Sequence, residues 1–103
     1  MLEIKRMDDP KGLRIEGELD LATVDRFRSS LAAMVREGGD IVLDVGDMRF
    51  MDSSGAQVLI RALRDLADRG RLVLARPQRT VLRLVRLMGL ERFENLEIQE
   101  AAA

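Results

Sequence analysis

The sequence contains no cysteine, no histidine, no tyrosine and no tryptophan. Without cysteine the chain cannot form disulfides, zinc–thiolate sites or thiol redox centres. Without histidine it lacks the most common general base, the group that would activate a serine hydroxyl for nucleophilic catalysis. These absences fit a cytoplasmic protein and weigh against redox and hydrolytic chemistry.

Aromatic residues and long apolar runs are also scarce. The only aromatic residues are three phenylalanines, although hydrophobic residues make up 47% of the 103 positions. The core must therefore be built mainly from Leu, Val, Ile and Met. No apolar stretch approaches the roughly 20 residues of a transmembrane helix, and the first residues lack the apolar centre of a signal peptide. We expect no direct membrane insertion.

Charge of either sign is plentiful but nearly balanced. Lys plus Arg number 17 and Asp plus Glu number 18, which gives a net charge of −1. Such a balance argues against bulk electrostatic attraction to nucleic acid, so we expect no direct nucleic-acid partner. The length predicts one compact domain over residues 1–103, with a frayed tail at about 100–103.

The spacing of apolar residues predicts the order of helices and strands. Apolar residues recur every three or four positions in three stretches, which predicts three helices with one apolar face each: Val24, Phe27, Leu31, Met34 and Val35 in the first, Val58, Leu59, Leu63 and Leu66 in the second, and Val81, Leu84, Val85 and Met88 in the third. The expected elements are strands at 2–7 and 13–17 joined as a hairpin, a helix at 23–37, a strand at 41–45, a loop at 46–50, a helix at 54–69, a strand at 72–75, a helix from Pro77 to about 88, and a strand at 96–98. Asp20 or Thr23 is expected to cap the first helix. The apolar runs at 41–45 and 72–75 predict strands buried on both faces. Strand–helix alternation after a hairpin predicts an α/β fold with a mostly parallel sheet.

The most informative stretch is F-M-D-S-S-G, from Phe50 to Gly55. It follows a predicted buried strand and opens a predicted helix, so Ser54 is expected in the first helical turn. There the unpaired backbone N–H groups and the positive end of the helix dipole favour negative charge. Sites in open parallel sheets form at this carboxyl edge of the strands. Ser54 is therefore a candidate phosphate acceptor, and a phosphate would add a charge of about −1.5 to −2.

Other roles for these residues remain open. Asp52, Ser53 and Ser54 also fit simple capping of the helix, because Asp and Ser are favoured capping types. Asp44, Asp47 and Asp52 could gather around a magnesium ion, although loop acids are more often solvated. A serine hydrolase is poorly supported, since no G-x-S-x-G elbow surrounds Ser54.

Two further groups of side chains are candidate protein-binding surfaces. Met48, Phe50 and Met51 would form an adaptable apolar rim beside the serine if they are exposed, and otherwise pack beneath the loop. Arg79, Arg83 and Arg86 share one face of the third predicted helix, which favours a solvated face over a docking surface for an acidic partner.

Three stretches together resemble the anti-sigma factor antagonists, bacterial proteins of the STAS domain class. The stretches are Gly17-Glu18-Leu19-Asp20, the segment from Leu43 to Gly55, and the segment from Arg83 to Phe93 with its M-G-L turn. They cover almost the whole chain in the family's order. The resemblance implies a single STAS-like α/β domain, with a mixed, mostly parallel sheet of about five strands, an N-terminal β-hairpin and at least three helices.

The resemblance also implies roles for individual residues. Ser54 corresponds to the phosphoacceptor, Asp52, Ser53 and Gly55 belong to the phosphorylation loop, and Asp20 lies in a segment that helps form the docking surface. We add Met48 and Met51 to this expected partner-binding set.

Members of the family act by binding rather than by catalysis. They bind an anti-sigma factor that is also an ATP-dependent serine kinase, and this binding frees the sigma factor. Phosphorylation of the serine ends the binding, and a serine phosphatase restores it. ATP and magnesium belong to the kinase, so no cofactor and no enzymatic activity are expected of this chain.

Two departures from the family pattern leave questions open. Ala56 stands where the family usually has Leu or Ile, which predicts looser packing of the first helical turn. The chain ends soon after Ile98, where many members continue into another helix, and a weak homodimer stays open. The alternative function is an accessory subunit of a transporter or of a sensory, stressosome-like assembly; the intact phosphorylation loop favours the switch.

Overall fold

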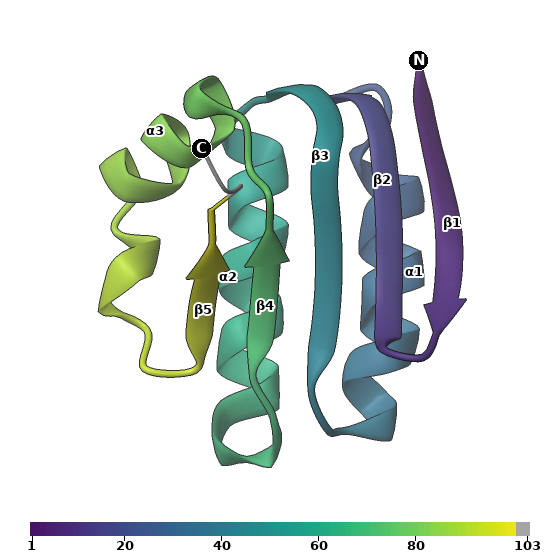
Figure 1. Cartoon of the computed structure of the whole chain (residues 1–103), viewed down its shortest axis with the longest axis vertical. Helices are drawn as coiled ribbons and strands as arrows, with labels where there is room; N and C mark the ends of the chain where they lie inside the picture. The colour runs from purple at the N-terminus through teal and green to yellow at the C-terminus, as the bar shows by residue number, and fades with distance from the viewer. Residues whose placement is uncertain (101–103) are drawn as a thin grey trace.

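The computed structural model describes residues 1–100 of the chain, which form one five-stranded sheet with helices packed on it (Figure 1). The strands are β1 (Leu2–Asp8), β2 (Lys11–Leu19), β3 (Ile41–Met51), β4 (Leu72–Ala75) and β5 (Leu96–Gln99), and they lie in the sheet in this order. β1 runs antiparallel to β2, and all other neighbours are parallel. The predicted α/β fold with an N-terminal hairpin is confirmed.

Three helices connect the parallel strands. They are α1 (Val24–Glu37), α2 (Ser53–Leu66) and α3 (Arg79–Leu87), with short 3-10 turns at Ala67–Arg69 and Leu90–Arg92. α1 and α2 lie side by side behind the sheet, whereas α3 lies near the carboxyl ends of the strands (Figure 1). The side chains of α1 that are buried are those its spacing predicted, namely Val24, Phe27, Leu31, Met34 and Val35.

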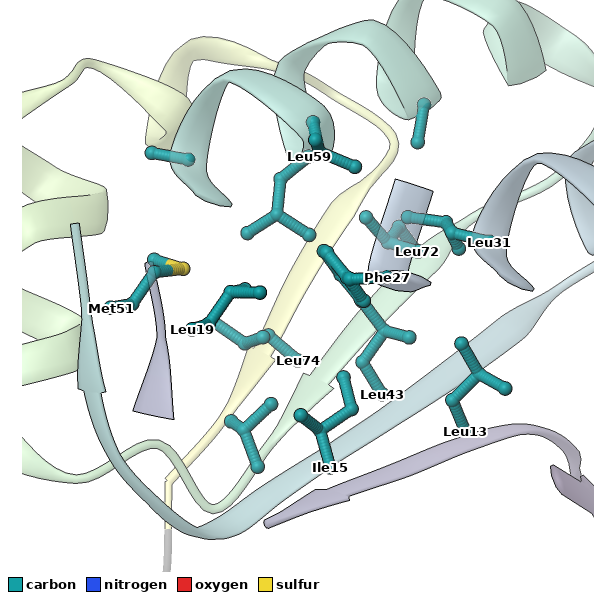
Figure 2. Packing of buried hydrophobic residues seen from close by; sticks show 14 of the residues in the cluster. Leu13, Ile15, Leu19, Phe27, Leu31, Leu43, Met51, Leu59, Leu72 and Leu74 are labelled. Carbon is teal, nitrogen blue, oxygen red and sulfur yellow. The ribbon is translucent and has the colours of Figure 1, made fainter. Parts of the chain in front are cut away.

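The core lies between the sheet and the pair α1 and α2. Figure 2 shows the side chains that meet there: Leu13, Ile15, Leu43 and Leu74 from the strands, and Phe27, Leu31 and Leu59 from the helices. All of them are buried. Complete burial of each such side chain is worth about 1.5–3 kcal/mol, so this layer fixes both helices on one face.

The expectation that the central strands are buried on both faces is wrong. In β3, Ile41, Leu43 and Val45 are buried, but Val42 and Asp44 between them are only half-buried. The physical reason is that α1 and α2 share one face, while α3 packs against the end of β3. The other face of the sheet is not covered by α1 or α2 (Figure 1).

Residues 46–50 form strand rather than the expected loop. β3 continues to Met51 because the long strand β2 pairs with it, up to Leu19 opposite Met51. The pairing is not regular throughout. β3 has one more residue than β2 between Arg14 and Glu16, and again between Gly17 and Glu18, so the register shifts at both places. This extended pairing carries the chain directly into α2.

Four other expectations concern the bounds or character of chain segments. The α-helical part of the second helix ends at Leu66, before the 3-10 turn, and the third helix begins at Arg79, two residues after Pro77. The expected frayed tail falls almost entirely outside the described residues. Across residues 1–100, no helix combines the length and the apolar character needed to cross a membrane.

Candidate functional site

The junction between β3 and α2 is built around the carboxylate of Asp52. This residue has an extended backbone, and its Oδ1 accepts hydrogen bonds from the backbone N–H groups of Ser54 at 2.9 Å and Gly55 at 3.4 Å. Its own N–H donates to the carbonyl of Leu19 at 3.0 Å, which ties the junction to the end of β2. Asp52 is therefore the N-cap of α2.

The hydroxyl of Ser54 is bound to the same carboxylate. Ser54 Oγ donates to Asp52 Oδ1 at 2.5 Å. This bond first, and then the backbone donors, hold the pKa of Asp52 below its ordinary value, although partial burial opposes the shift. The carboxylate is ionised at neutral pH, so a phosphate on Ser54 would lie beside a negative charge.

Ser54 is accessible from a groove between α1 and α2. Ser53 is exposed, Ser54 is half-buried and Gly55 is buried. The groove is lined by Leu21, Arg28, Arg36, Ser54, Gln57 and Arg61, among others. A protein that docks across the two helices would thus contact the serine hydroxyl.

Asp20 shapes the loop next to this junction. Its Oδ1 accepts hydrogen bonds from the backbone N–H groups of Ala22 at 3.0 Å and Thr23 at 3.2 Å. Thr23, one of the two positions expected to cap α1, is its N-cap residue, but its side chain makes no capping hydrogen bond. Asp20 instead holds the turn that carries Leu21.

Leu21 is a surface residue that the sequence reasoning missed. Its side chain is 78% exposed at the mouth of the groove. An exposed leucine costs little by itself, but one beside a polar cluster is a typical contact for a partner protein. The signal in the sequence was an apolar residue inside the polar turn after Asp20, outside any helical or strand period.

Gly55 is required by packing. A Cβ at this position would lie 2.7 Å from Leu19 Cδ2 and 2.7 Å from Met51 Cγ. The next residue, Ala56, is completely buried. The first turn of α2 is therefore packed tightly against the sheet, and the looser packing expected from Ala56 is not found.

The prediction that Met48 and Met51 belong to an exposed apolar rim beside the serine is wrong, and both methionines instead pack beneath the junction. Met48 is 1% exposed and Met51 is 5% exposed, because both point into the core from β3. Phe50, which points the other way, is 48% exposed. Met48 and Met51 can therefore support the junction from beneath but cannot contact a partner directly.

The acids considered for magnesium binding do not gather. Asp44 pairs with Arg76 at 2.7 Å, Asp47 pairs with Arg14 at 2.9 Å, and Asp52 caps α2. Among the residues that the structure describes, no three His, Cys, Asp or Glu side chains are placed to hold a metal ion.

The arginines on α3 form a solvent-facing row. Arg79, Arg83 and Arg86 are all exposed, and Arg86 pairs with Glu91 at 3.4 Å. The open face of α3 lies opposite its buried residues Val81 and Val85, as the spacing predicted.

Comparison with known proteins places this geometry in a family. The family model of the STAS domain matches residues 1–103. The anti-sigma F factor antagonist of Lysinibacillus sphaericus is 32% identical over 81 residues, which cover 76% of this chain and 69% of that protein.

Two solved structures have the same fold over nearly the whole chain. The anti-sigma factor antagonist SpoIIAA in its unphosphorylated form superposes with a TM-score of 0.75 at 26% identity, covering 99% of this chain and 89% of that one. The Bacillus cell fate determinant SpoIIAA in its phosphorylated form gives a TM-score of 0.71 at 25% identity, covering 99% and 92%. With its family model matched from end to end, the chain belongs to the STAS domain family.

Proposed function

We propose that this protein is an anti-sigma factor antagonist controlled by phosphorylation of Ser54. In its unphosphorylated form it binds an anti-sigma factor that is also a serine kinase, and the sigma factor is released. The observation that carries the proposal is the position of Ser54, half-buried at the start of α2 and lining the groove between α1 and α2. Relatives named anti-sigma factor antagonists, one of them solved in both phosphorylation states, support it.

The docking surface that we propose combines a polar centre with apolar neighbours. Ser54 lies at its centre, and Leu21 and Phe50 are the exposed apolar residues on either side of the junction. Burial of Leu21 against a partner would supply part of the binding free energy. The Ser54 hydroxyl would lie inside the contact, where an added phosphate cannot be solvated.

Phosphorylation would change the surface and leave the fold in place. Asp52 already occupies the N–H groups of Ser54 and Gly55, so the phosphate must turn outward, away from the carboxylate. It would bring a charge of about −1.5 to −2 into a contact that was built around a neutral hydroxyl. A serine phosphatase would then restore the binding-competent form.

Binding to the purified cognate anti-sigma factor tests the proposal. We expect Ser54→Asp to bind at least about tenfold more weakly than the wild type, a loss of about 1.4 kcal/mol. Ser29→Asp is the matched control and should bind like the wild type, since it adds the same charge on an exposed serine of α1 that does not line the groove. Equal affinity of Ser54→Asp and the wild type would contradict the proposal, as would failure of the wild type to displace sigma factor.

A further inference from the structure

The outer edge of β1 is the longest open edge of the sheet. β1 occupies one end of the strand order, and in the described part of the chain no strand pairs with its outer side (Figure 1). The other edge, β5, has four residues, whereas β1 has seven. An open edge strand offers unpaired backbone donors and acceptors to another strand.

The hydrogen-bond pattern shows which residues face outward. The N–H of Glu18 donates to the carbonyl of Met1, and the register pairs Leu2 with Gly17. Because bonding alternates along an antiparallel pair, Leu2, Ile4 and Arg6 turn their backbone groups away from β2. The carbonyl of Leu2 indeed accepts a hydrogen bond from Arg26 of α1 at 2.8 Å, which leaves Ile4 and Arg6 as the free positions.

Two charged side chains of β1 lie directly opposite like charges on β2. Glu3 is paired in register with Glu16, and Lys5 with Arg14, so each faces a like charge. Like charges directly opposite each other destabilise an antiparallel pair. Within residues 1–100, neither Glu3 nor Lys5 forms an ion pair, whereas Arg14 binds Asp47 and Glu16.

We infer that β1 pairs with β1 of a second copy of this chain, in the antiparallel register centred on Ile4. In that register Ile4 faces Ile4 of the second copy and Leu2 faces Arg6, so the outward backbone groups match. The Leu2 carbonyl has two lone pairs and accepts the N–H of Arg6 beside its bond from Arg26. Glu3 then faces Lys5 of the other copy, twice by symmetry. Registers centred on Lys5 or on Arg6 would place like charges together, so the charges select one register. This inference does not depend on the proposed function, because the edge lies away from Ser54.

The helix beside the edge leaves room for this pairing. Arg26 contacts Leu2, and Glu37 lies 3.7 Å from Arg6, so one row of α1 runs along β1. Between these ends the row carries Ser30 and Ala33, both small and half-buried. A single strand pair is a small interface, so the dimer is a weak one.

Sedimentation equilibrium of charge-swapped variants tests the inference. We expect the untagged wild type to pass from a monomer of 11.6 kDa to twice that mass between about 10 µM and about 1 mM. Lys5→Glu and Glu3→Lys should each raise the dissociation constant at least about tenfold, since each places like charges across the two-fold axis. The double variant, and an equimolar mixture of the two single variants, should dimerise like the wild type.

The controls separate lost pairing from lost folding. Each single swap places opposite charges across β1 and β2, so the melting temperature should stay the same or rise. Arg79→Glu changes the net charge as Lys5→Glu does, but on α3, and should leave the dimer intact. A wild type that stays monomeric throughout, or a dimer that neither single swap weakens, would overturn the inference.

Discussion

At the scale of single residues, Asp52 links the stability of the fold to the state of Ser54. One oxygen of its carboxylate receives two backbone N–H groups and the serine hydroxyl. The residue that caps α2 is thus also the neighbour that a phosphate on Ser54 would meet. The effect on the stability of the fold and the proposed effect on partner binding can therefore be measured separately, by changing Asp52 in one variant and Ser54 in another.

Removal of the cap should destabilise the protein by a modest amount. We expect Asp52→Ala to lower the free energy of unfolding by about 1 kcal/mol, because two N–H groups of α2 lose their acceptor. For a domain of this size the melting temperature should fall by roughly 4–8 °C, measured by calorimetry. Ser53→Ala, on an exposed neighbour, should change it little. Equal melting temperatures for Asp52→Ala and the wild type would show that Asp52 does not stabilise the helix.

The charge of Asp52 should appear in the pH dependence of stability. Its pKa is lowered in the folded state, so its stabilising effect is complete above the unfolded-state pKa of about 3.9 and is lost as pH falls through the folded-state pKa. Asp52→Asn keeps a capping oxygen without the charge. The difference in unfolding free energy between the wild type and Asp52→Asn should therefore shrink as the pH is lowered below about 4. A difference independent of pH would contradict an ionised cap.

Leu21 should matter for binding and not for folding. We expect Leu21→Ala to weaken binding to the anti-sigma factor while the unfolding free energy changes by less than about 0.5 kcal/mol. Leu87→Ala is the matched control, because Leu87 is 74% exposed, close to the 78% of Leu21, but lies on α3. Calorimetric titration of both variants would contradict the proposed surface if Leu87→Ala lost as much affinity as Leu21→Ala.

At the scale of elements, the first turn of α2 is held in place by contact with the ends of β2 and β3. Gly55 provides this close approach, since any Cβ there would overlap Leu19 and Met51. We expect Gly55→Ala to lower the free energy of unfolding by about 1–3 kcal/mol, although alanine favours helix, because overpacking outweighs propensity. Urea unfolding measures this. A variant as stable as the wild type would mean that α2 can shift without cost.

The sequence predicted helices more accurately than strand ends. The apolar spacing of α1 and α2 identified the buried residues of α1 and, in α2, Val58, Leu59, Leu63 and Leu66. The continuation of β3 through residues 46–51 was missed because it depends on pairing with β2, a contact between segments far apart in the chain. Local patterns cannot report such pairing.

At the scale of the whole molecule, the sheet has one covered face and one open face. An apolar run such as Ile41–Val45 cannot reveal this, because Val42 is half-buried between two buried neighbours. The same lack of information about distant contacts explains the error on Met48 and Met51, whose burial is decided by the face of β3 on which they lie. The serine junction was located correctly, since D-S-S-G at a strand–helix boundary fixes its own local geometry.

In the molecule as a whole, the Ser54 hydroxyl lies where α1 and α2 meet the ends of β2 and β3. The proposed role of this hydroxyl can be tested by incubating the protein with its cognate anti-sigma factor kinase and ATP and mapping the phosphate by peptide mass spectrometry. We expect one phosphate per chain, located on Ser54, with Ser53→Ala modified like the wild type and Ser54→Ala left unmodified. Phosphate on Ser53, or undiminished phosphorylation of Ser54→Ala, would contradict it.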